Sequence, residues 1–390
     1  MKLPLNNSYA LLMIMLSPQK TPSIKADLIT AIKNEQFQWE ALLYQANVQM
    51  CTPLWYSQLK KDDFLPYMPE DLVAYLLEIY NSNQARNQQL QMALVALLTE
   101  FNKAKIDTLL LKGAATFCDQ LFSDAGSRFM GDLDILVADD EVEPSRKILQ
   151  RLGFKEIPDE GMELDGLPTD IRHHQLPRYF IPGTPVVVEI HFKLSYALVG
   201  RMITPDAAWK TRSKTKFMGQ NTSVLSAEHK LLLNAAHAMI PHCEYISGHI
   251  SLLQLTEFVL LAQCYSNSIN WHNWFNVARK YSLSSEFKSY LNLAVHYMNL
   301  TLSSKDQVKQ HSDFNNKRIL FIGDHDAVLE QDKLSFYSIM YRYFYTLYYY
   351  LKLPAWMWQN VCYAPGWKNI PVRILFCLKK LFSSRSWKKI

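Results

Sequence analysis

Apolar positions recur at helical spacing through most of the first hundred residues. Residues 71–105 contain few helix breakers, and apolar residues there lie three or four positions apart: Leu90, Leu94, Leu97, Leu98 and Phe101. This period gives a helix one continuous apolar face, so the pattern predicts a long amphipathic helix. The apolar run from Tyr9 to Leu16 stops at residues 17–20 without a small-residue cleavage site, which favours a short buried helix over a secretory signal.

The pattern changes after residue 105, where short apolar runs alternate with helical stretches. Strands are predicted by apolar, partly β-branched runs at 108–111, 133–137, 175–181 and 186–192. Helices are predicted at 114–121 and 140–152, the second ending at Gly153 as a C-cap residue. Residues 182–185 read Pro-Gly-Thr-Pro, which predicts a turn because proline fixes φ and glycine supplies a positive φ.

From Pro205 onward the chain reads as helical again. Helices are predicted at 227–239, 250–265, 271–281 and 286–300, and a polar loop at 303–316. We therefore expect an N-terminal helical region at 1–105, an α/β core at 106–195, a C-terminal helical region at 196–335, and an aromatic-rich segment with a basic tail at 336–390. The fold class is α/β (α+β), with a small mixed-sheet core flanked by N- and C-terminal helical regions.

Composition narrows the class of protein. The chain has 390 residues, 49% of them hydrophobic and 20% charged, which excludes disorder over most of its length and fits two or three folded units. The six cysteines form no Cys-x-x-Cys pair, so a zinc site or a disulfide framework is not expected. Free thiols in a reducing cytoplasm are the simplest interpretation.

The basic character of the chain belongs to its tail. Net charge is +5, but residues 367–390 hold seven Lys or Arg and no acid, so the rest of the chain carries −2. Leucines and phenylalanines at 375–382 flank Lys379 and Lys380, which predicts a basic amphipathic helix. Two interpretations stay open: peripheral contact with anionic membrane at the inner face, or packing on the aromatic segment 336–367. No run reaches the roughly 20 apolar residues of a membrane span.

Two aspartates carry the first candidate chemistry. Asp132 and Asp134 begin a predicted strand and are two positions apart, so their carboxylates point to one face. Two carboxylates that close repel each other unless a cation lies between them, and Mg²⁺ prefers carboxylates, water and substrate phosphates as ligands. The pair predicts a magnesium site, although an isolated Asp-x-Asp is also common in surface loops.

A third acid lies within another apolar strand. Glu189 stands in Val-Val-Val-Glu-Ile-His at 186–191, where burial without a partner is costly. If this strand pairs beside the Asp-x-Asp strand, Glu189 completes a three-carboxylate cluster able to hold two metal ions. The alternative is a salt bridge from Glu189 to Arg128 or Lys193. His191 shares the face of Glu189.

The turn at Lys112-Gly113 is the third candidate. A helix starting at Ala114 would direct its free N–H groups at an anion, Gly113 allows close backbone approach, and Lys112 can add a positive charge for a phosphate. Most single Lys-Gly turns, however, are only turns.

The histidines divide into two groups. His173 and His174 precede a strand and are candidates to face the cleft, while His191 either orients Glu189 or acts as a base near the acceptor. His229, His237 and His242 lie in or near one helix. The step of eight from 229 to 237 differs from the step of four of a helical metal-ligand pair, so helix packing is the favoured interpretation.

These motifs resemble those of the family of bacterial uncharacterised nucleotidyltransferases, in the superfamily of DNA polymerase beta. The resemblance rests on five features within residues 111–191: Leu111-Lys112-Gly113, Arg128 to Val137, Gly153-Phe154, His174, and Val188-Glu189-Ile190-His191. With less specific similarity in the flanking helical regions, it covers roughly residues 10–300. Two departures are Ala114, where superfamily members have Ser or Gly, and Glu257, where the family has Asp.

The resemblance implies the roles of the residues and the reaction. Asp132, Asp134 and Glu189 would bind two Mg²⁺ ions, Lys112, Gly113 and Arg128 would lie on the triphosphate side, and His174 and His191 on the acceptor side. The reaction would move a nucleoside monophosphate from a nucleoside triphosphate such as ATP to an acceptor hydroxyl or phosphate, with pyrophosphate release. The Ala114 departure keeps open a catalytically inactive nucleotide-binding or scaffold protein on the same fold.

The expected acceptor is a small molecule, a glycan or a protein. Residues 106–195 hold 9 Lys or Arg against 16 Asp or Glu, a net charge of −7. Nucleic acid is an unfavoured acceptor, because its phosphates would meet a negatively charged surface.

Overall fold

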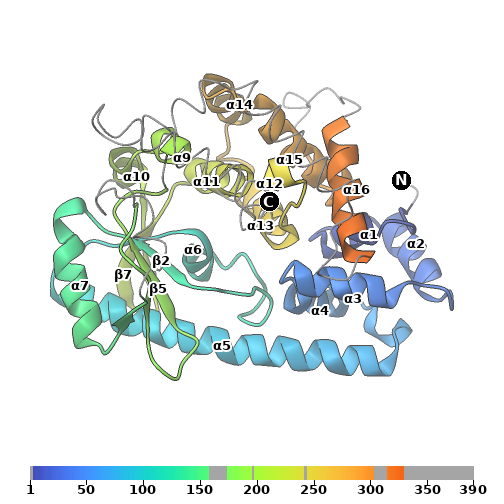
Figure 1. Cartoon of the computed structure of the whole chain (residues 1–390), viewed down its shortest axis with the longest axis horizontal. Helices are drawn as coiled ribbons and strands as arrows, with labels where there is room; N and C mark the ends of the chain where they lie inside the picture. The colour runs from blue at the N-terminus through green and yellow to red at the C-terminus, as the bar shows by residue number, and fades with distance from the viewer. Residues whose placement is uncertain (1–2, 158–173, 196, 241–243, 303–313, 329–390) are drawn as a thin grey trace, which may run out of the picture.

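The computed structural model describes residues 3–157, 174–195, 197–240, 244–302 and 314–328. Within them, a mixed sheet lies at one end of the molecule and helices make up the other (Figure 1). The expected fold class, a small mixed-sheet α/β core flanked by helical regions, is confirmed.

The N-terminal region is helical, as the apolar periodicity predicts. Its helices are α1 (Ser8–Leu16), α2 (Pro22–Ile32), α3 (Trp39–Val48), α4 (Thr52–Lys61), the short 3₁₀ helix η1 (Leu65–Tyr67) and α5 (Glu70–Lys103). The side chain of Asn7 caps α1 by accepting a hydrogen bond from the backbone N–H of Ala10. All residues of α1 from Tyr9 to Leu16 are buried, so the short buried helix is confirmed.

Helix α5 joins the two ends of the molecule. Figure 1 shows it running from beside the sheet to the N-terminal helices. The five apolar residues that predicted it, from Leu90 to Phe101, are all fully buried and belong to the core of the sheet. It packs against α4, β7 and α7. Near its start the Tyr80 ring lies against Tyr56 of α4, and near its end Asn102 donates to the Asn221 carbonyl of β7. The helix therefore fixes the position of the sheet relative to the N-terminal helices.

The sheet has seven strands in the described residues, in the order β3-β4-β5-β2-β1-β7-β6. The strands are β1 (Leu109–Leu110), β2 (Leu133–Leu136), β3 (Lys155–Glu156), β4 (Tyr179–Phe180), β5 (Val187–His191), β6 (Ser213–Phe217) and β7 (Gln220–Val224). Helix α6 (Lys112–Asp119) connects β1 to β2, and η2 (Asp139–Glu141) and α7 (Val142–Arg151) follow β2. Strand β4 covers only the end of the predicted strand 175–181, and Gln175 forms an isolated bridge with His191.

The expectation of helix throughout the region after Pro205 is wrong for residues 213–224. These residues form the hairpin β6–β7, and β7 pairs in parallel with β1, so the sheet extends beyond residue 195. Met218 and Gly219 connect the strands with φ values of 45° and 85°. Two successive positive φ values are typical of a two-residue hairpin turn, in which glycine is favoured.

The C-terminal helices largely follow the predicted ranges. They are α9 (Ala197–Met202), α10 (Pro205–Thr211), α11 (Ala227–Met239), α12 (Glu244–Ser247), α13 (Leu252–Cys264), α14 (Trp271–Lys280), α15 (Ser284–Tyr297) and α16 (Phe314–Val328). Residues 314–316 open α16 rather than closing the predicted loop, whose other residues lie outside the described ranges. The aromatic segment 336–367 and the basic tail also lie outside them. In the part of the chain that is described, no helix is both long and apolar enough to cross a membrane.

A buried ion-pair cluster ties the start of α2 to the end of α4. Lys20 Nζ lies 2.7 Å from Asp62 Oδ2, and Lys25 Nζ lies 2.7 Å from Asp62 Oδ1. The side chains of Lys20 and Asp62 are only 1% and 7% exposed. Burial lowers the pKa of Lys20 to about 8 although Asp62 opposes this change. Burial alone would raise the pKa of Asp62, but the two ammonium groups lower it below its ordinary value.

Replacing Asp62 by asparagine should destabilise the protein strongly, because Lys20 would remain buried without its counter-ion. We expect the free energy of unfolding in urea at pH 7 to fall by about 3 kcal/mol. Glu143→Gln is the control: Glu143 is exposed and pairs with a half-buried Arg146, so this substitution should change stability by less than about 0.5 kcal/mol. Equal, small effects of the two substitutions would contradict this account.

Candidate active site

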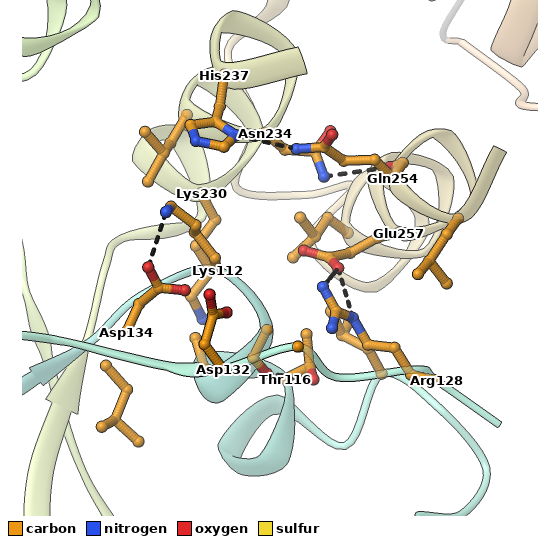
Figure 2. A pocket seen from close by; sticks show the side chains of 18 of the residues that line it. Lys112, Thr116, Arg128, Asp132, Asp134, Lys230, Asn234, His237, Gln254 and Glu257 are labelled. Carbon is orange, nitrogen blue, oxygen red and sulfur yellow. Dashed lines mark hydrogen bonds and ion pairs between the residues drawn. The ribbon is translucent and has the colours of Figure 1, made fainter. Parts of the chain in front are cut away.

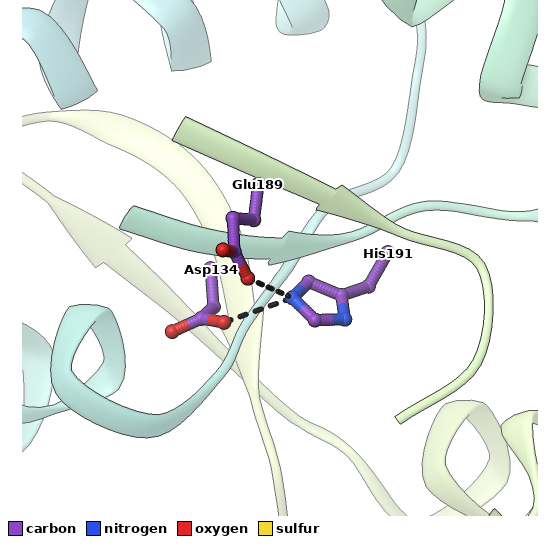
Figure 3. A group of neighbouring side chains, drawn as sticks. All are labelled: Asp134, Glu189 and His191. Carbon is purple, nitrogen blue, oxygen red and sulfur yellow. Dashed lines mark hydrogen bonds and ion pairs between the residues drawn. The ribbon is translucent and has the colours of Figure 1, made fainter. Parts of the chain in front are cut away.

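The site begins with the pairing of strands β2 and β5. They are parallel neighbours, and their register sets Asp134 opposite Glu189 and Leu136 opposite His191. Residues in register on adjacent strands share a face, and side chains two positions apart share it too. The sheet therefore places Asp134, Glu189 and His191 together, as Figure 3 shows. The strand pairing on which the three-carboxylate prediction depended is thus present.

The carboxylate of Asp134 lies at the centre of this group. His191 Nε2 is 2.8 Å from Asp134 Oδ1 and 3.5 Å from Glu189 Oε2, and Lys112 Nζ is 2.7 Å from the same Asp134 oxygen. Burial would raise the pKa of Asp134, but Lys112 and His191 lower it well below its usual range. Burial would lower the pKa values of Lys112 and His191, but the neighbouring carboxylates raise both. Asp134 is therefore held in its ionised form by the Lys112 ammonium and by the contact with His191.

Asp132 is in the opposite electrostatic situation. It lies one residue before β2, borders the same pocket as Asp134 and Glu189, and has no salt bridge within the described residues. Burial, together with the negative charges of Asp134 and Glu189, raises its pKa to about 7. A bound cation would remove this repulsion. Carboxylate oxygens are ligands that Mg²⁺ prefers. The ligand atoms of Asp134, Glu189 and His191 lie within 4.8 Å of one another, and Asp132 borders the same pocket without belonging to this group.

Gly113 lies against the ends of two side chains, Arg128 and Met130. Helix α6 begins at Lys112, two residues earlier than predicted, and Lys112 has a φ of 44°. A Cβ atom on Gly113 would lie 2.6 Å from Arg128 Nη1 and 2.9 Å from Met130 Sδ. The backbone at the start of α6 and the Arg128 guanidinium therefore touch, which brings Lys112 and Arg128 to the same helix N-terminus.

Arg128 pairs with a helix far away in the sequence. Its Nε and Nη2 atoms lie 2.8 and 2.7 Å from Glu257 Oε2 on α13, and Nη1 donates to the carbonyl of Phe129 at 3.1 Å. The suggested salt bridge from Glu189 to Arg128 is thus absent from the described ion pairs, and the Lys193 ammonium lies over the Phe192 ring instead.

A pocket of about 490 Å³ lies between these groups and helices α11 and α13. Figure 2 shows Asp132 and Asp134 on one wall and side chains of α11 and α13 across from them. Polar residues of the far wall that the sequence did not single out for binding are Lys230, Asn234, His237 and Gln254. Lys230, Asn234 and His237 lie four and three positions apart in α11, where the other residues from 231 to 239 are apolar. This spacing was the available signal.

The pocket wall is connected by polar contacts. Lys230 Nζ lies 2.5 Å from Asp119 Oδ1 at the end of α6, and Asn234 Nδ2 donates to the Gln254 carbonyl at 3.2 Å. Helices α6, α11 and α13 are therefore held against one another around the pocket.

Of the described histidines that the sequence singled out, two line the pocket, one is buried beside the carboxylates, and one contacts a threonine of α10. His174 lines the pocket, and its ring centroid is 5.2 Å from that of His191. His191 is fully buried against the carboxylates, which favours the orienting role over that of a base. His229 contacts the Thr211 hydroxyl at 3.1 Å, whereas His237 borders the pocket. His173 and His242 lie outside the described ranges.

The comparison with family models agrees with the motifs. A family model described as "Uncharacterised nucleotidyltransferase" matches residues 35–299. No curated protein matches the chain. Among solved structures, the chain is similar to an antigenic nucleotidyltransferase-like protein from Paracoccidioides brasiliensis, with 18% identity, a TM-score of 0.32, and coverage of 52% of this chain and 93% of that one.

The raised pKa of Asp132 predicts a pH-dependent cost to stability. Because its pKa in the folded protein, about 7, exceeds the ordinary value of 3.8, ionisation of Asp132 destabilises the fold progressively between about pH 4 and 7. Asp132→Asn should therefore raise the Tm, and by more at pH 8 than at pH 5, in thermal unfolding with EDTA present. The exposed Asp139→Asn serves as control and should show no such pH dependence. A Tm gain that is the same at both pH values would refute the raised pKa.

Proposed function

The chain belongs to the family of uncharacterised nucleotidyltransferases, which makes it an enzyme of the transferase class, and on this premise we propose a magnesium-dependent reaction. A nucleoside monophosphate is moved from a nucleoside triphosphate to an acceptor hydroxyl or phosphate, and pyrophosphate is released. The observation that carries the proposal is the β2–β5 register, which sets Asp134 beside Glu189, with Asp132 at the same pocket.

Asp132, Asp134 and Glu189 are the proposed ligands of two Mg²⁺ ions. Bound Mg²⁺ would supply charge stabilisation for the attacking and leaving oxygens. His191 contacts both Asp134 and Glu189, because its Nε2 lies within 3.5 Å of each carboxylate. A buried group that contacts a ligand in this way fixes the direction in which the carboxylate points.

The donor phosphates are proposed to lie at the start of α6. Two cationic side chains meet there, Lys112 at the first helical position and Arg128 against Gly113. Free backbone N–H groups at a helix N-terminus add to their attraction for an anion. Thr116, one turn further along α6, borders the pocket, but its hydroxyl donates to the Gly113 carbonyl. Ala114 leaves the turn without the hydroxyl that other superfamily members carry.

The acceptor is proposed to enter along α11 and α13, with His174 on its side of the pocket. Each Lys or Arg among the described lining residues is paired with an acid: Lys112 with Asp134, Arg128 with Glu257 and Lys230 with Asp119. An acceptor with many phosphates would find few uncommitted cations in this pocket. A hydroxyl on a small molecule, a glycan or a protein suits it better than nucleic acid.

One observation favours the alternative of a catalytically inactive nucleotide-binding or scaffold protein. Asp134 Oδ1 already contacts Lys112 and His191, so a metal ion must compete with Lys112 for this carboxylate. The same Lys112 amine, once released from Asp134, would be available to a phosphate. If Mg²⁺ displaces Lys112 from Asp134, the enzyme is favoured. If it does not, the inactive protein is favoured.

Titration calorimetry with non-hydrolysable ATP, CTP, GTP and UTP analogues tests the proposal. We expect at least one analogue to bind in the presence of Mg²⁺ and not in EDTA, and the Asp132→Asn/Asp134→Asn variant to lose this binding. The exposed pair in Asp139→Asn/Asp140→Asn has the same change of charge and should bind like the native chain. If no triphosphate binds in either condition, the donor assignment fails and the inactive scaffold is favoured.

The preference against nucleic acid leads to a separate expectation. Because the lining cations are paired and residues 106–195 carry −7, single-stranded RNA or DNA should be retained weakly in a filter-binding assay at low salt. A variant lacking the basic residues 367–390 separates the contribution of the tail from that of the pocket. Tight, salt-sensitive retention by that truncated chain would overturn the preference.

A further inference from the structure

Three polar side chains on α5 form hydrogen bonds with the backbone of the segment that precedes Asp132. Asn83, Arg86 and Asn87 lie three and four positions apart, on one face of a helix whose buried residues are otherwise apolar. Asn83 and Asn87 are 5% and 1% exposed. All three side chains donate to backbone carbonyls of residues 125–131, which we call the arginine segment because it contains Arg128.

The two asparagines share one carbonyl. Asn87 Nδ2 lies 2.6 Å from the carbonyl oxygens of both Ala125 and Arg128. Asn83 Nδ2 lies 2.7 Å from the carbonyl oxygen of Gly126 and 3.0 Å from that of Arg128. The main chain of Arg128 is therefore held by two neighbouring amides on α5.

Arg86 forms hydrogen bonds with the two residues that precede Asp132. Its Nε lies 2.9 Å from the Met130 carbonyl oxygen and its Nη2 lies 3.3 Å from that of Gly131. The guanidinium also lies over the Phe129 ring, 5.2 Å from the centroid. The residue that follows Gly131 is Asp132, so these hydrogen bonds end directly before the candidate metal ligand.

The chemistry of these contacts requires an amide. A carbonyl oxygen only accepts hydrogen bonds, so each asparagine must direct its NH₂ group at the segment. The Oδ1 atoms of Asn83 and Asn87 are then left buried without a partner among the described residues. Leaving a buried acceptor unpaired opposes folding. Stability alone does not explain this arrangement, whereas positioning of Arg128 does.

We propose that Asn83, Arg86 and Asn87 are positioning residues that fix the arginine segment for binding of the donor triphosphate. Arg128 is held at both ends: α5 holds its carbonyl, and Glu257 on α13 holds its guanidinium. Gly113 abuts that guanidinium at the start of α6. This inference rests on the proposed function, because the anion that Arg128 would meet is the donor triphosphate.

Asn87→Asp tests the proposal with almost no change of shape. The substitution replaces the donating NH₂ by a carboxylate oxygen that repels the carbonyls of Ala125 and Arg128. We expect the Kd for the magnesium complex of a non-hydrolysable triphosphate analogue, measured by titration calorimetry, to rise about tenfold or more. Gln88→Glu is the matched control: it is the adjacent, exposed residue with the same change of charge, and its Kd should match that of the native chain.

A double-mutant cycle distinguishes positioning from a general loss of stability. If Asn87 acts through Arg128, Asn87→Asp should have little further effect on the Kd in an Arg128→Ala background. Arg86→Met, at a half-buried position, should also weaken binding and takes the place of Asn87→Asp if that variant fails to fold.

The outcomes separate this inference from the proposed function. A native chain that binds no triphosphate defeats the proposed function and this inference with it. A native chain that binds, with Asn87→Asp and Arg86→Met binding equally well, overturns the positioning role alone. Additive effects of Asn87→Asp and Arg128→Ala also overturn it, because they would indicate independent action.

Discussion

The parallel pairing of β2 with β5 is the constraint on which the site depends. Leu133, Ile135, Val188 and Ile190 are fully buried in the core of the sheet, so the alternate positions of both strands face the other side. A shift of one residue in the register would move Glu189 to the apolar core. The burial of four aliphatic side chains therefore fixes where the carboxylates meet. It brings the acids together although their negative charges repel one another.

The presence or absence of a counter-ion beside a buried acid distinguishes structural acids from candidate functional ones. Asp62 is enclosed by two ammonium groups, and Asp134 by Lys112 and His191. Asp132 has no such counter-ion in the described structure, and its pKa is raised rather than lowered. An acid that the fold brings close to two others without a cation of its own is poised for an added one. This contrast supports Asp132 as part of a binding site rather than of the scaffold.

Arg128 shows how distant parts of the chain converge. Its carbonyl is held by α5 and its guanidinium by α13, and the guanidinium also lies against Gly113 at the start of α6. Spacing predicted most of the helices but not the hairpin at 213–224, and the Lys112-Gly113 turn was singled out from the sequence. The triphosphate-side role of Arg128 came from the family resemblance. Spacing could not show that Glu257 is the partner of Arg128, or that the asparagines of α5 hold it. These contacts span 129 and about 40 residues of sequence.

The sequence by itself determined which side chains share a face, because strand and helix periods are local properties of the chain. That was enough for the long helix α5, the Asp132–Asp134 pair and the Glu189–His191 pair. Tertiary structure decided which faces meet. It placed the hairpin 213–224 beside β1, where weak local patterning had predicted helix, and it turned the Lys230, Asn234 and His237 stripe towards the pocket. Both outcomes depend on packing between distant segments, whose free energy no local window of sequence contains.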